Sequence, residues 1–597
     1  MKRWVLRKND ANIELMSEVL KIDPVLCNIL ANRNIRSKNT AIRFLNPILD
    51  YLHPMDEMMG VAKATNIIQD GIEADKRFCI FGDYDADGVS STVILRKGLE
   101  GLGADIWHYI PHREKEGYGL NLAAVEEIAN DCHILIAVDN GIAAADEVTR
   151  AAELGIEVII IDHHEPPFTE KEDGSRQEVL PPAAAIINPK QSSCKYPFKE
   201  LSAAGLSYKF IQHLYAESNI DFEAADEALV FATIATFCDV VDLVDENRIL
   251  AKNGLRLLNT QGTKNVGLNA LVKARNLEYN SIDDFAIGFV LGPCINASGR
   301  LSCADLAVEL FLTQDEARAA ELAAELVELN EERKTLCAKH VDNTIASLEM
   351  SQLDDVLVLF IPEIHESIAG IVAGRVKEHT QHPTIVFSDA HGVAKGSARS
   401  IEGYNVFEAL QKHKDLFDRF GGHAMAAGIT MPIENIDELR KRLNADSELT
   451  SEDFVPVIYG EKELVLDEVT FELAQQIASL SPFGKSNKEP VFFTKDIVTE
   501  KVEIIGQSGE TLRITLRTDG GRKITAIAFK AVTNFIRLLE QNYAENIPKN
   551  FADGRLTNLN IKLDIAYNIR INTFKGNSSL QLVLADFKHP AFYTNPI

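Results

Sequence analysis

This 597-residue chain lacks the features that mark membrane, secreted and disulfide-rich proteins. No run approaches the roughly 20 apolar residues that a membrane span needs. The first residues, MKRWVLRKNDANIEL, hold no apolar segment of the kind found in signal peptides. The eight cysteines are scattered and form no CxxC pair. We therefore expect a protein of the reducing cytoplasm, with no membrane contact.

The chain also lacks an excess of basic residues. Its net charge of −27 argues against a simple nucleic-acid binder, which would carry a basic balance. From residue 491 onward, however, 14 Lys and Arg stand against 10 Asp and Glu. Phosphate contact depends on local rather than net charge, so a binding groove in the terminal part is compatible with the composition.

The most informative run is FGDYDADGVSST (81–92), which follows an apolar stretch and holds three alternating carboxylates. Asp83, Asp85 and Asp87 would repel one another in a packed turn, so a cation is their natural partner. A calcium loop is excluded, because loop position twelve is Ile94 where that motif needs Glu. For this run alone, a solvated acidic turn remains an alternative.

Two further strand-like runs end in the same kind of residue. CHILIAVDNG (132–141) stops at Asp139, and IEVIIIDHHEPP (156–167) stops at Asp162, His163 and His164. Open α/β sheets place their sites at the carboxyl ends of strands. Mixed Asp and His ligation suits manganese, magnesium, iron or zinc rather than calcium. More than four candidate ligands are enough for two metal ions that share a carboxylate.

The runs DYDADG, DNG and DHH together resemble the DHH phosphoesterase superfamily. The segment 230–250 resembles its fourth motif, with Asp239 in the ligand position. LGPCINASGRL (291–301), GSARSIEGYNVFEAL (396–410) and FGGHAMAAG (420–428) are similar to its single-strand-specific exonuclease branch. The resemblance covers roughly residues 20–590. One departure is Phe81, where many members have His, and Asp83 is the candidate to take over that coordination place.

The resemblance implies a role for each site residue. It implies two divalent ions, Mn²⁺ or Mg²⁺, with Asp139 as the bridging ligand. The implied metal ligands are Asp83, Asp85, Asp87, Asp139, His163 and Asp239. Beside the catalytic residues Asp139 and His163, His164 is expected to stabilise the transition state and Asp162 to orient the His pair. Arg300, Arg399 and His423 are implied on the substrate strand.

GSARS (396–400) also suggests a phosphate site without the resemblance. Ser397 and Arg399 follow a glycine there, where backbone N–H groups and a guanidinium could hold a phosphate. Alone, this signal is weak.

The expected fold class is α/β: two α/β lobes joined by a long helix, followed by a β-barrel. Thr313 is expected to cap the long helix through the run TQDE (313–316), and the helix is expected to extend to about residue 347. Strand-like runs from about residue 455 favour a small barrel, and the resemblance implies an OB-fold. The expected segments are an N-terminal helical segment (1–70), a DHH catalytic domain (71–260), a connector with the long helix (261–350), a DHHA1-like substrate-binding domain (351–450) and a single-strand-binding barrel (455–597).

The resemblance implies a metal-dependent 5′→3′ exonuclease on single-stranded DNA, acting in repair and recombination. One alternative is a small-substrate phosphodiesterase for oligoribonucleotides or cyclic dinucleotides, or the related pyrophosphatase. The other is a non-catalytic replication or repair scaffold. Expected partners are single-stranded DNA and, as candidates, a helicase or a single-strand-binding protein. The chain itself is expected to be a monomer.

Overall fold

The computed structural model describes residues 2–170, 176–544, 547, 551, 554–574 and 576–590. The chain divides into two compact units: residues 1–47 with 456–597 form unit 1, and residues 48–455 form unit 2. The first 47 residues thus pack with the last 142 in sequence, a pairing of chain ends that the expected segments did not contain.

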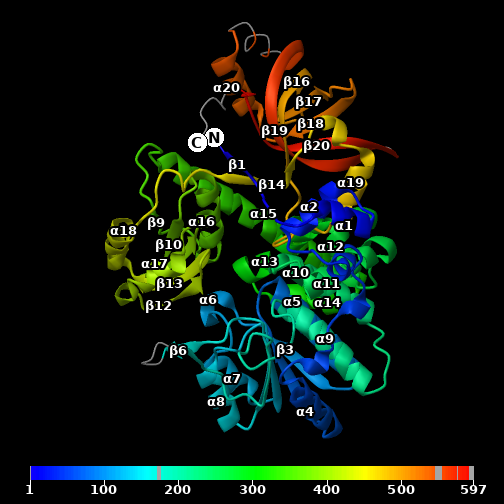
Figure 1. Ribbon diagram of the computed structural model, residues 1–597. Coiled ribbons are helices and arrows are strands. Elements are labelled where there is room, and N and C mark those ends of the chain that lie inside the picture. The colour runs from blue at the N-terminus through cyan, green and yellow to red at the C-terminus, as the bar shows by residue number, and fades with distance from the viewer. Residues whose placement is uncertain are drawn as a thin grey trace. The chain divides into compact units, whose positions relative to one another are not determined.

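The first lobe of unit 2 is built on a parallel five-stranded sheet of order β3-β2-β4-β5-β8 (Figure 1). Its strands are β2 (Arg77–Phe81), β3 (Asp105–Tyr109), β4 (Ile134–Val138), β5 (Glu157–Ile161) and β8 (Ala185–Ile187). The core of one face comes from α4 (Val61–Glu73), α5 (Ala86–Gly101), α9 (Ala203–Glu217) and α10 (Ala225–Cys238). The other face is covered by α7 (Leu122–Ile128) and α8 (Ala145–Glu153). Burial on both faces explains why the central strands read as continuous apolar runs.

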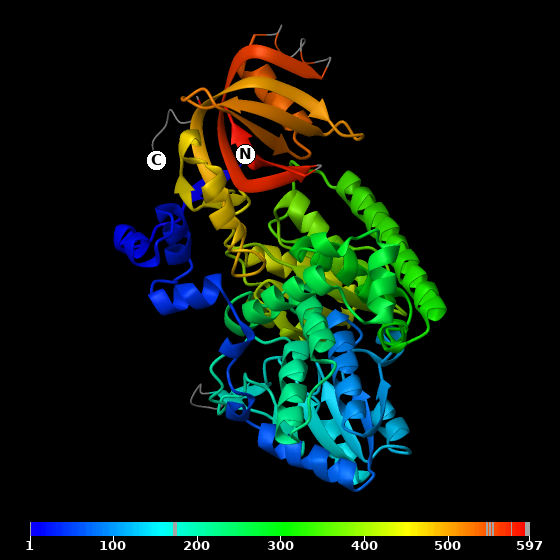
Figure 2. The same ribbon diagram turned by 90° about the vertical axis from the view of Figure 1, so that its right-hand side faces the viewer.

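A helical region follows the sheet and ends in the expected long helix. It comprises α11 (Asp245–Gln261), α12 (Val266–Ala274), the π-helix η4 (Ala286–Leu291), α13 (Gly292–Leu301), α14 (Asp305–Leu312) and α15 (Glu316–Ser347). The 32 residues of α15, the long green helix of Figure 2, span about 48 Å. The expected cap was wrong by two residues. Asp315, not Thr313, caps α15, because its carboxylate accepts from the N–H groups of Ala317 and Arg318.

The second lobe of unit 2 is a five-stranded sheet of order β12-β13-β11-β10-β9. Its strands are β9 (Leu357–Phe360), β10 (Thr384–Ala390), β11 (Val393–Arg399), β12 (Arg419–His423) and β13 (Ala426–Pro432), and its helices are α16 (Glu366–Thr380), α17 (Val406–Gln411) and α18 (Ile436–Ala445). Most of the run GSARS therefore lies in a central strand, β11. Gly396 is required there by packing, since an added Cβ would lie 2.4 Å from the Phe387 ring.

Unit 1 contains the expected closed barrel. Five strands, β16 (Phe492–Ile505), β17 (Thr511–Arg517), β18 (Lys523–Ala528), β20 (Asn577–Lys588) and β19 (Arg555–Phe574), follow one another in the sheet, and pairing of β16 with β19 closes it. The helix α20 (Val532–Asn542) lies between β18 and β19 in sequence. Residues of α2 share one apolar core with the barrel strands, which is why the chain ends form one unit.

The remaining α-helices and strands of unit 1 in the described residues are β1 (Arg3–Leu6), α1 (Ile13–Leu20), α2 (Pro24–Asn32), α3 (Lys38–Leu45), β14 (Val457–Gly460), β15 (Lys462–Glu463) and α19 (Phe471–Ala478). The sequence did not suggest β1, which pairs in parallel with β14 at the far end of the chain. Unit 2 also holds α6 (Arg113–Glu116), β6 (Phe168–Glu170) and β7 (Arg176–Glu178). Within the described ranges, none of the helices is both long and apolar enough to cross a bilayer.

Candidate metal centre and substrate face

The first acidic run forms a tight corner between β2 and α5. Asp85 caps α5, accepting from the backbone N–H groups of Asp87 (2.9 Å) and Gly88 (3.1 Å). A Cβ on Gly88 would lie 2.5 Å from the carbonyl oxygen of Asp83, so only glycine fits there. The corner thus holds three carboxylates close together at the carboxyl end of a central strand.

Asp87 is fixed from the opposite side by a second helix. Its two carboxylate oxygens accept from the N–H groups of Ala203 and Ala204, each at 2.8 Å, in the first turn of α9. A helix N-terminus stabilises a negative charge. Burial and the charge of Asp85 nevertheless raise the pKa of Asp87 to about 7.

Asp139 follows β4 in a strained backbone conformation. Its φ is +61°, a left-handed value that non-glycine residues seldom adopt, and Gly141 follows with φ +102°. The turn buries the Asp139 carboxylate, with Oδ1 3.2 Å from Nε2 of His163. The backbone strain at Asp139 therefore accompanies a carboxylate aimed into the cluster.

His163 lies at the centre of the carboxylates. Its Nε2 is 3.7 Å from both Asp87 Oδ2 and Asp239 Oδ2. Burial and the charge of His164 lower the pKa of His163 to about 3, so the ring is neutral, as a metal ligand must be. Asp239 ends α10, and Val240 after it has φ +55°, a genuine outlier for a β-branched residue.

The cluster fits a metal centre on the chemistry of its own atoms. Three groups each offer ligand atoms within 4.8 Å of one another: Asp139 with His163 and His164, Asp87 with His163 and Asp239, and Asp83 with Asp85 and Asp139. Buried Asp83 Oδ1, Asp139 Oδ1 and His163 Nε2 have no hydrogen-bond partner among the described residues. Burial and mutual repulsion raise the pKa values of Asp83, Asp139 and Asp239. Divalent cations would satisfy all of these atoms at once.

Asp162 contacts both histidines of the pair. Its Oδ1 accepts from the His163 N–H at 2.7 Å and lies 2.7 Å from His164 Nδ1, while Oδ2 accepts from the Ile142 N–H at 3.0 Å. Burial alone would raise the Asp162 pKa, but the hydrogen bond and charge of His164 lower it to about 2. Burial lowers the pKa of His164, but the hydrogen bond to Asp162 outweighs this and raises it to about 9. The His164 ring is therefore a cation at neutral pH.

Sequence reasoning missed the residues that follow β3. The Tyr118 hydroxyl donates to the Asp139 carbonyl oxygen (3.2 Å) and lies 3.2 Å from His164 Nε2. The Arg113 guanidinium lies over the ring of Tyr84, 5.0 Å from its centroid. The available signal was the parallel sheet itself, because residues after each strand meet at one edge.

Helix α13 connects the acidic corner to the second lobe. The Asn296 side chain accepts from the Ala86 N–H at 2.7 Å, and a Cβ on Gly299 would lie 2.3 Å from the Tyr84 carbonyl oxygen. Arg300 is half-buried, and its Nη1 donates to the carbonyl oxygen of Ser367 in α16 at 2.6 Å. Burial and the charges of Arg113 and Arg333 lower its pKa to about 10, which still leaves it charged.

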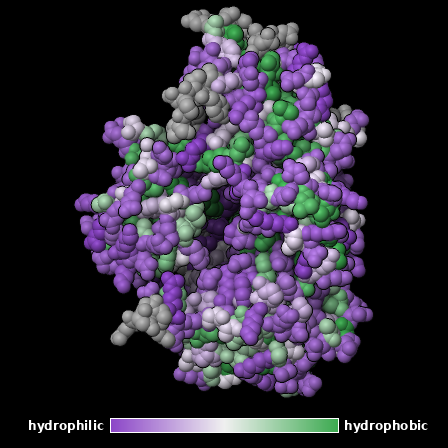
Figure 3. All heavy atoms as spheres, in the orientation of Figure 1, coloured by the Kyte–Doolittle hydropathy of each residue, from purple (hydrophilic) through white to green (hydrophobic). Residues whose placement is uncertain are grey.

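Two of the other predicted substrate residues lie against the same helix. Arg399 and Ser397 both lie close to Gly370. A Cβ added to Gly370 would be 2.8 Å from Nη2 of Arg399 and 3.4 Å from Cβ of Ser397. Gly370 is one turn beyond Ser367 in α16, so Arg300, Ser397 and Arg399 gather around one helix. His423 lies at the exposed end of β12. Figure 3 shows a hollow in the molecular surface between the second lobe and the helical region that includes α13.

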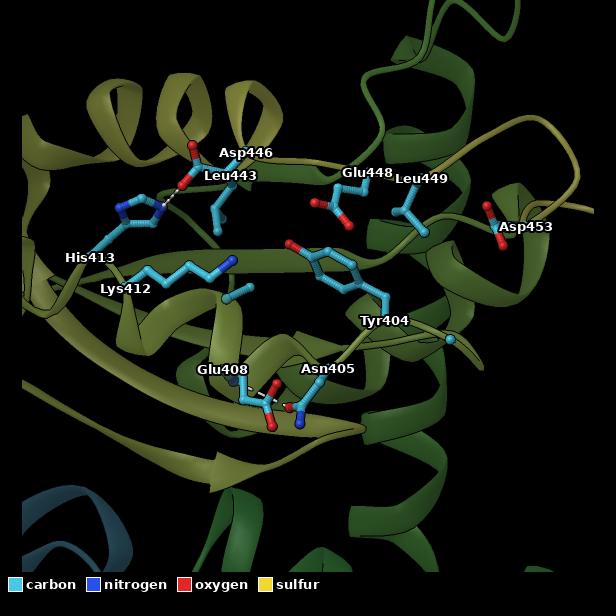
Figure 4. Close-up of a pocket in the computed structure, with 12 residues that line it drawn as sticks. Tyr404, Asn405, Glu408, Lys412, His413, Leu443, Asp446, Glu448, Leu449 and Asp453 are labelled. Carbon is cyan, nitrogen blue, oxygen red and sulfur yellow. Dashed lines mark hydrogen bonds and ion pairs between the residues drawn. The ribbon is translucent and has the colours of Figure 1, made fainter. Parts of the chain in front are cut away.

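A separate cavity of about 390 Å³ lies in the second lobe, between α17 and the segment after α18 (Figure 4). Its lining includes Tyr404, Lys412, Glu448 and a His413 ring whose Nε2 is 3.3 Å from Asp446 Oδ2. None of the site residues predicted from the sequence lines this cavity. It is therefore not the predicted site.

Comparison with known proteins gives matches along most of the chain. The models of the DHH family N-terminal domain, the DHHA1 domain and the RecJ OB domain match residues 77–236, 353–447 and 461–586. They agree with the expected fold class, including an OB-fold for the barrel.

Two curated relatives are each named single-stranded-DNA-specific exonuclease RecJ. The chain is 38% identical to the one from Bacillus subtilis, over 87% of this chain and 65% of that protein. It is 32% identical to the one from Haemophilus influenzae, over 95% of this chain and 96% of that protein. The chain thus spans somewhat less than two thirds of the Bacillus relative. The structure of RecJ from Thermus thermophilus in complex with Mn²⁺ matches with a TM-score of 0.79 and 26% identity, over 98% of this chain and 80% of that one.

Proposed function

The chain belongs to the RecJ family within the DHH superfamily, and on that premise we propose that it is a metal-dependent exonuclease. It hydrolyses phosphodiester bonds of single-stranded DNA in the 5′→3′ direction, in DNA repair and recombination. One observation carries the proposal: four strand or helix ends deliver Asp87, Asp139, His163 and Asp239 to one buried cluster. A scaffold protein would have no use for such a cluster, because its unpaired buried charges are costly.

The ligands of the proposed centre are Asp83, Asp85, Asp87, Asp139, His163 and Asp239. Two divalent ions, Mn²⁺ or Mg²⁺, would neutralise the phosphoryl oxygens and lower the pKa of a water molecule at this place. Asp139 belongs to two of the three ligand groups, which supports its proposed role as the shared ligand. His164 is held as a cation by Asp162 and stabilises the negative charge that develops on the phosphoryl group.

The second lobe is proposed to position the strand for this reaction. Arg300 and Arg399 present guanidinium groups around α16, and a guanidinium binds phosphate oxygens in pairs. Ser397 and His423 are the proposed additional contacts. We assign catalysis to residues 71–260, substrate binding to residues 351–450 and holding of the single strand to residues 455–597. The small-substrate alternative would have no role for the barrel.

Finer proposals concern assembly and location. We propose a monomer that acts in the cytoplasm. The proposed partner is a helicase or a single-strand-binding protein. A helicase supplies single strands and a single-strand-binding protein covers them, so both present the proposed substrate.

The test uses end-labelled single strands, blunt duplexes and two-nucleotide substrates, each with Mn²⁺ or Mg²⁺. We expect single strands to be shortened from the 5′ end and the duplex to be degraded much more slowly. A duplex degraded as fast as a single strand, without a helicase, would refute the single-strand proposal. Preference for the two-nucleotide substrate over long strands would favour the small-substrate alternative.

A further inference from the structure

Two phenylalanines of the π-helical segment are unusually exposed. Phe289 is 67% and Phe285 60% exposed, and Phe289 has the highest value among the described large hydrophobic side chains. Their rings are stacked, with centroids 5.1 Å apart and planes 20° from parallel. Exposure of large apolar side chains is costly, and paired exposed aromatics are typical of a binding surface.

The local structure holds both rings outward. The opposite face of η4 is buried through Ala286, Ile287 and Leu291, so the segment cannot rotate to hide the rings. A Cβ on Gly288, between them in sequence, would meet no atom within 4 Å, which shows open space beside the pair. π-helical turns are frequent at functional sites.

This pair belongs to the helix that reaches the metal centre. η4 continues directly into α13, whose Asn296 side chain contacts the acidic corner. At the junction, a Cβ on Gly292 would lie 2.2 Å from the Sγ of Cys238, the residue before Asp239. From Phe289 to Arg300 the helix rises about 16 Å, which equals about five nucleotides of a stacked strand.

Val240 is a further exposed apolar side chain, next in sequence to a proposed ligand. It directly follows Asp239, has a strained backbone and is 59% exposed. Three of the four most exposed large hydrophobic side chains in the described parts of the chain are therefore Phe285, Phe289 and Val240. Since η4 packs against α10, Phe285 and Phe289 belong to an element that neighbours the helix ending just before Asp239 and Val240.

We propose that Phe285 and Phe289 form a stacking platform for nucleobases of the substrate strand, several nucleotides from the bond that is cleaved. The inference rests on the proposed function and adds a contact to it. Stacking suits an enzyme without sequence preference, because every base has a π-face. Base stacking also suits this acidic chain. The Asp283 carboxylate accepts a hydrogen bond from the Ala286 N–H, and its negative charge would repel phosphates near the two rings. The bases are therefore the part of the strand that this surface can bind.

The experiment uses the full chain and separates aromatic stacking from apolar contact. The double variant Phe285→Leu/Phe289→Leu keeps apolar side chains but loses the π-faces, and Phe285→Tyr/Phe289→Tyr keeps them. Ile220→Ala, at another exposed apolar position, is the control. KM and kcat are measured on 5′-phosphorylated strands of 2 to 20 nucleotides.

For the Leu variant we expect KM on 20-nucleotide strands to rise about tenfold, and much less on two-nucleotide strands. The Tyr variant and Ile220→Ala should match the wild type. Single abasic sites moved along the strand should raise KM for the wild type at one or two positions only, and this sensitivity should disappear in the Leu variant.

Three results would overturn the platform. The first is an unchanged KM in the Leu variant at every strand length, and the second is an equal rise of KM in the Leu and Tyr variants. The third is a change of sedimentation without a change of KM, which would assign the surface to a protein contact. If the wild type cleaves no single strand, the proposed function fails instead. Binding of single strands in chelator, compared between wild type and Leu variant by fluorescence anisotropy, would then still decide the platform.

Discussion

The metal centre of unit 2 and the barrel of unit 1 differ in whether their charged side chains have partners. In the centre, Asp83 and Asp139 are buried, and each has an oxygen without a hydrogen-bond partner among the described residues. In the barrel, Glu503 forms ion pairs with Lys501 at 2.6 Å and with Arg513 at 3.3 Å. The first arrangement leaves buried carboxylates without a counter-charge, whereas in the second each acidic oxygen lies beside a cation.

The difference changes the interpretation of the basic terminal region. Lys523 also pairs with Glu500, and Arg522 donates to the carbonyl oxygens of Leu466 and Val469. Much of the positive charge counted from the sequence is thus engaged within unit 1. Electrostatic attraction of a strand by the barrel is therefore weaker than the count suggests, whereas the charge imbalance that supports chemistry is concentrated in unit 2.

The largest expected effect concerns the unpaired centre. Asp139→Ala should lower kcat by about three orders of magnitude or more, because the proposed shared ligand is lost, while thermal unfolding stays near the wild-type temperature since carboxylate repulsion is relieved. Asp105→Ala, which removes a 71% exposed carboxylate, is the matched control. Near-normal turnover of Asp139→Ala, or of the wild type in excess chelator, would contradict a metal mechanism.

The next effect tests whether the barrel binds without taking part in the chemistry. A fragment of residues 48–455 lacks all of unit 1 and should show a KM at least about tenfold higher on long strands, with two-nucleotide substrates much less affected. Removing residues 456–597 alone should instead cause aggregation, because Leu30 of α2 would lose its core. A similar loss at every length would mean that unit 1 serves folding or catalysis.

A smaller effect should appear in the pH dependence of stability. Burial and Asp85 raise the folded-state pKa of Asp87 from 3.8 to about 7. A raised carboxyl pKa contributes stability that is full below the unfolded value and is lost as pH rises through the folded one. In chelator, the unfolding temperature of unit 2 should therefore fall between about pH 4 and pH 7, and Mn²⁺ should restore it. A flat profile in chelator would show that the carboxylates are not crowded.

The smallest expected effect is a gain in the barrel. Glu503→Gln removes the acid that pairs with Lys501, Arg513 and Arg555, so the freed cations should raise single-strand affinity a few-fold at low salt. Titration of a labelled strand at two salt concentrations measures this. Glu468→Gln, whose oxygen is 3.9 Å from Lys462, serves as a control. An unchanged affinity would place the strand elsewhere on unit 1.

Much of the candidate site could be predicted because its parts are local. Asp85, Asp139 and His163 each follow a strong apolar run, and parallel strands bring such ends to one edge. Long-range partners could not be predicted in this way. The bond from Ala86 to Asn296 joins residues 210 positions apart, and no local pattern announces it.

The errors have a similar cause. Thr313 and Asp315 are both good caps, and the choice between them depends on where the helix begins to pack. Nothing in the sequence indicated that GSARS lies in a strand, which pairing with β10 and β13 decides, because tertiary contacts override local preference.

The sequence by itself determined which metal-type residues follow the strands, the two α/β lobes, the long helix and the barrel, since each depends on residue type and periodicity over short distances. Only the tertiary structure decided that residues 1–47 pack with the barrel, that Arg300 reaches α16 and that Phe285 and Phe289 stay exposed. These outcomes depend on which distant surfaces compete for burial, and that competition is settled only when the whole chain has folded.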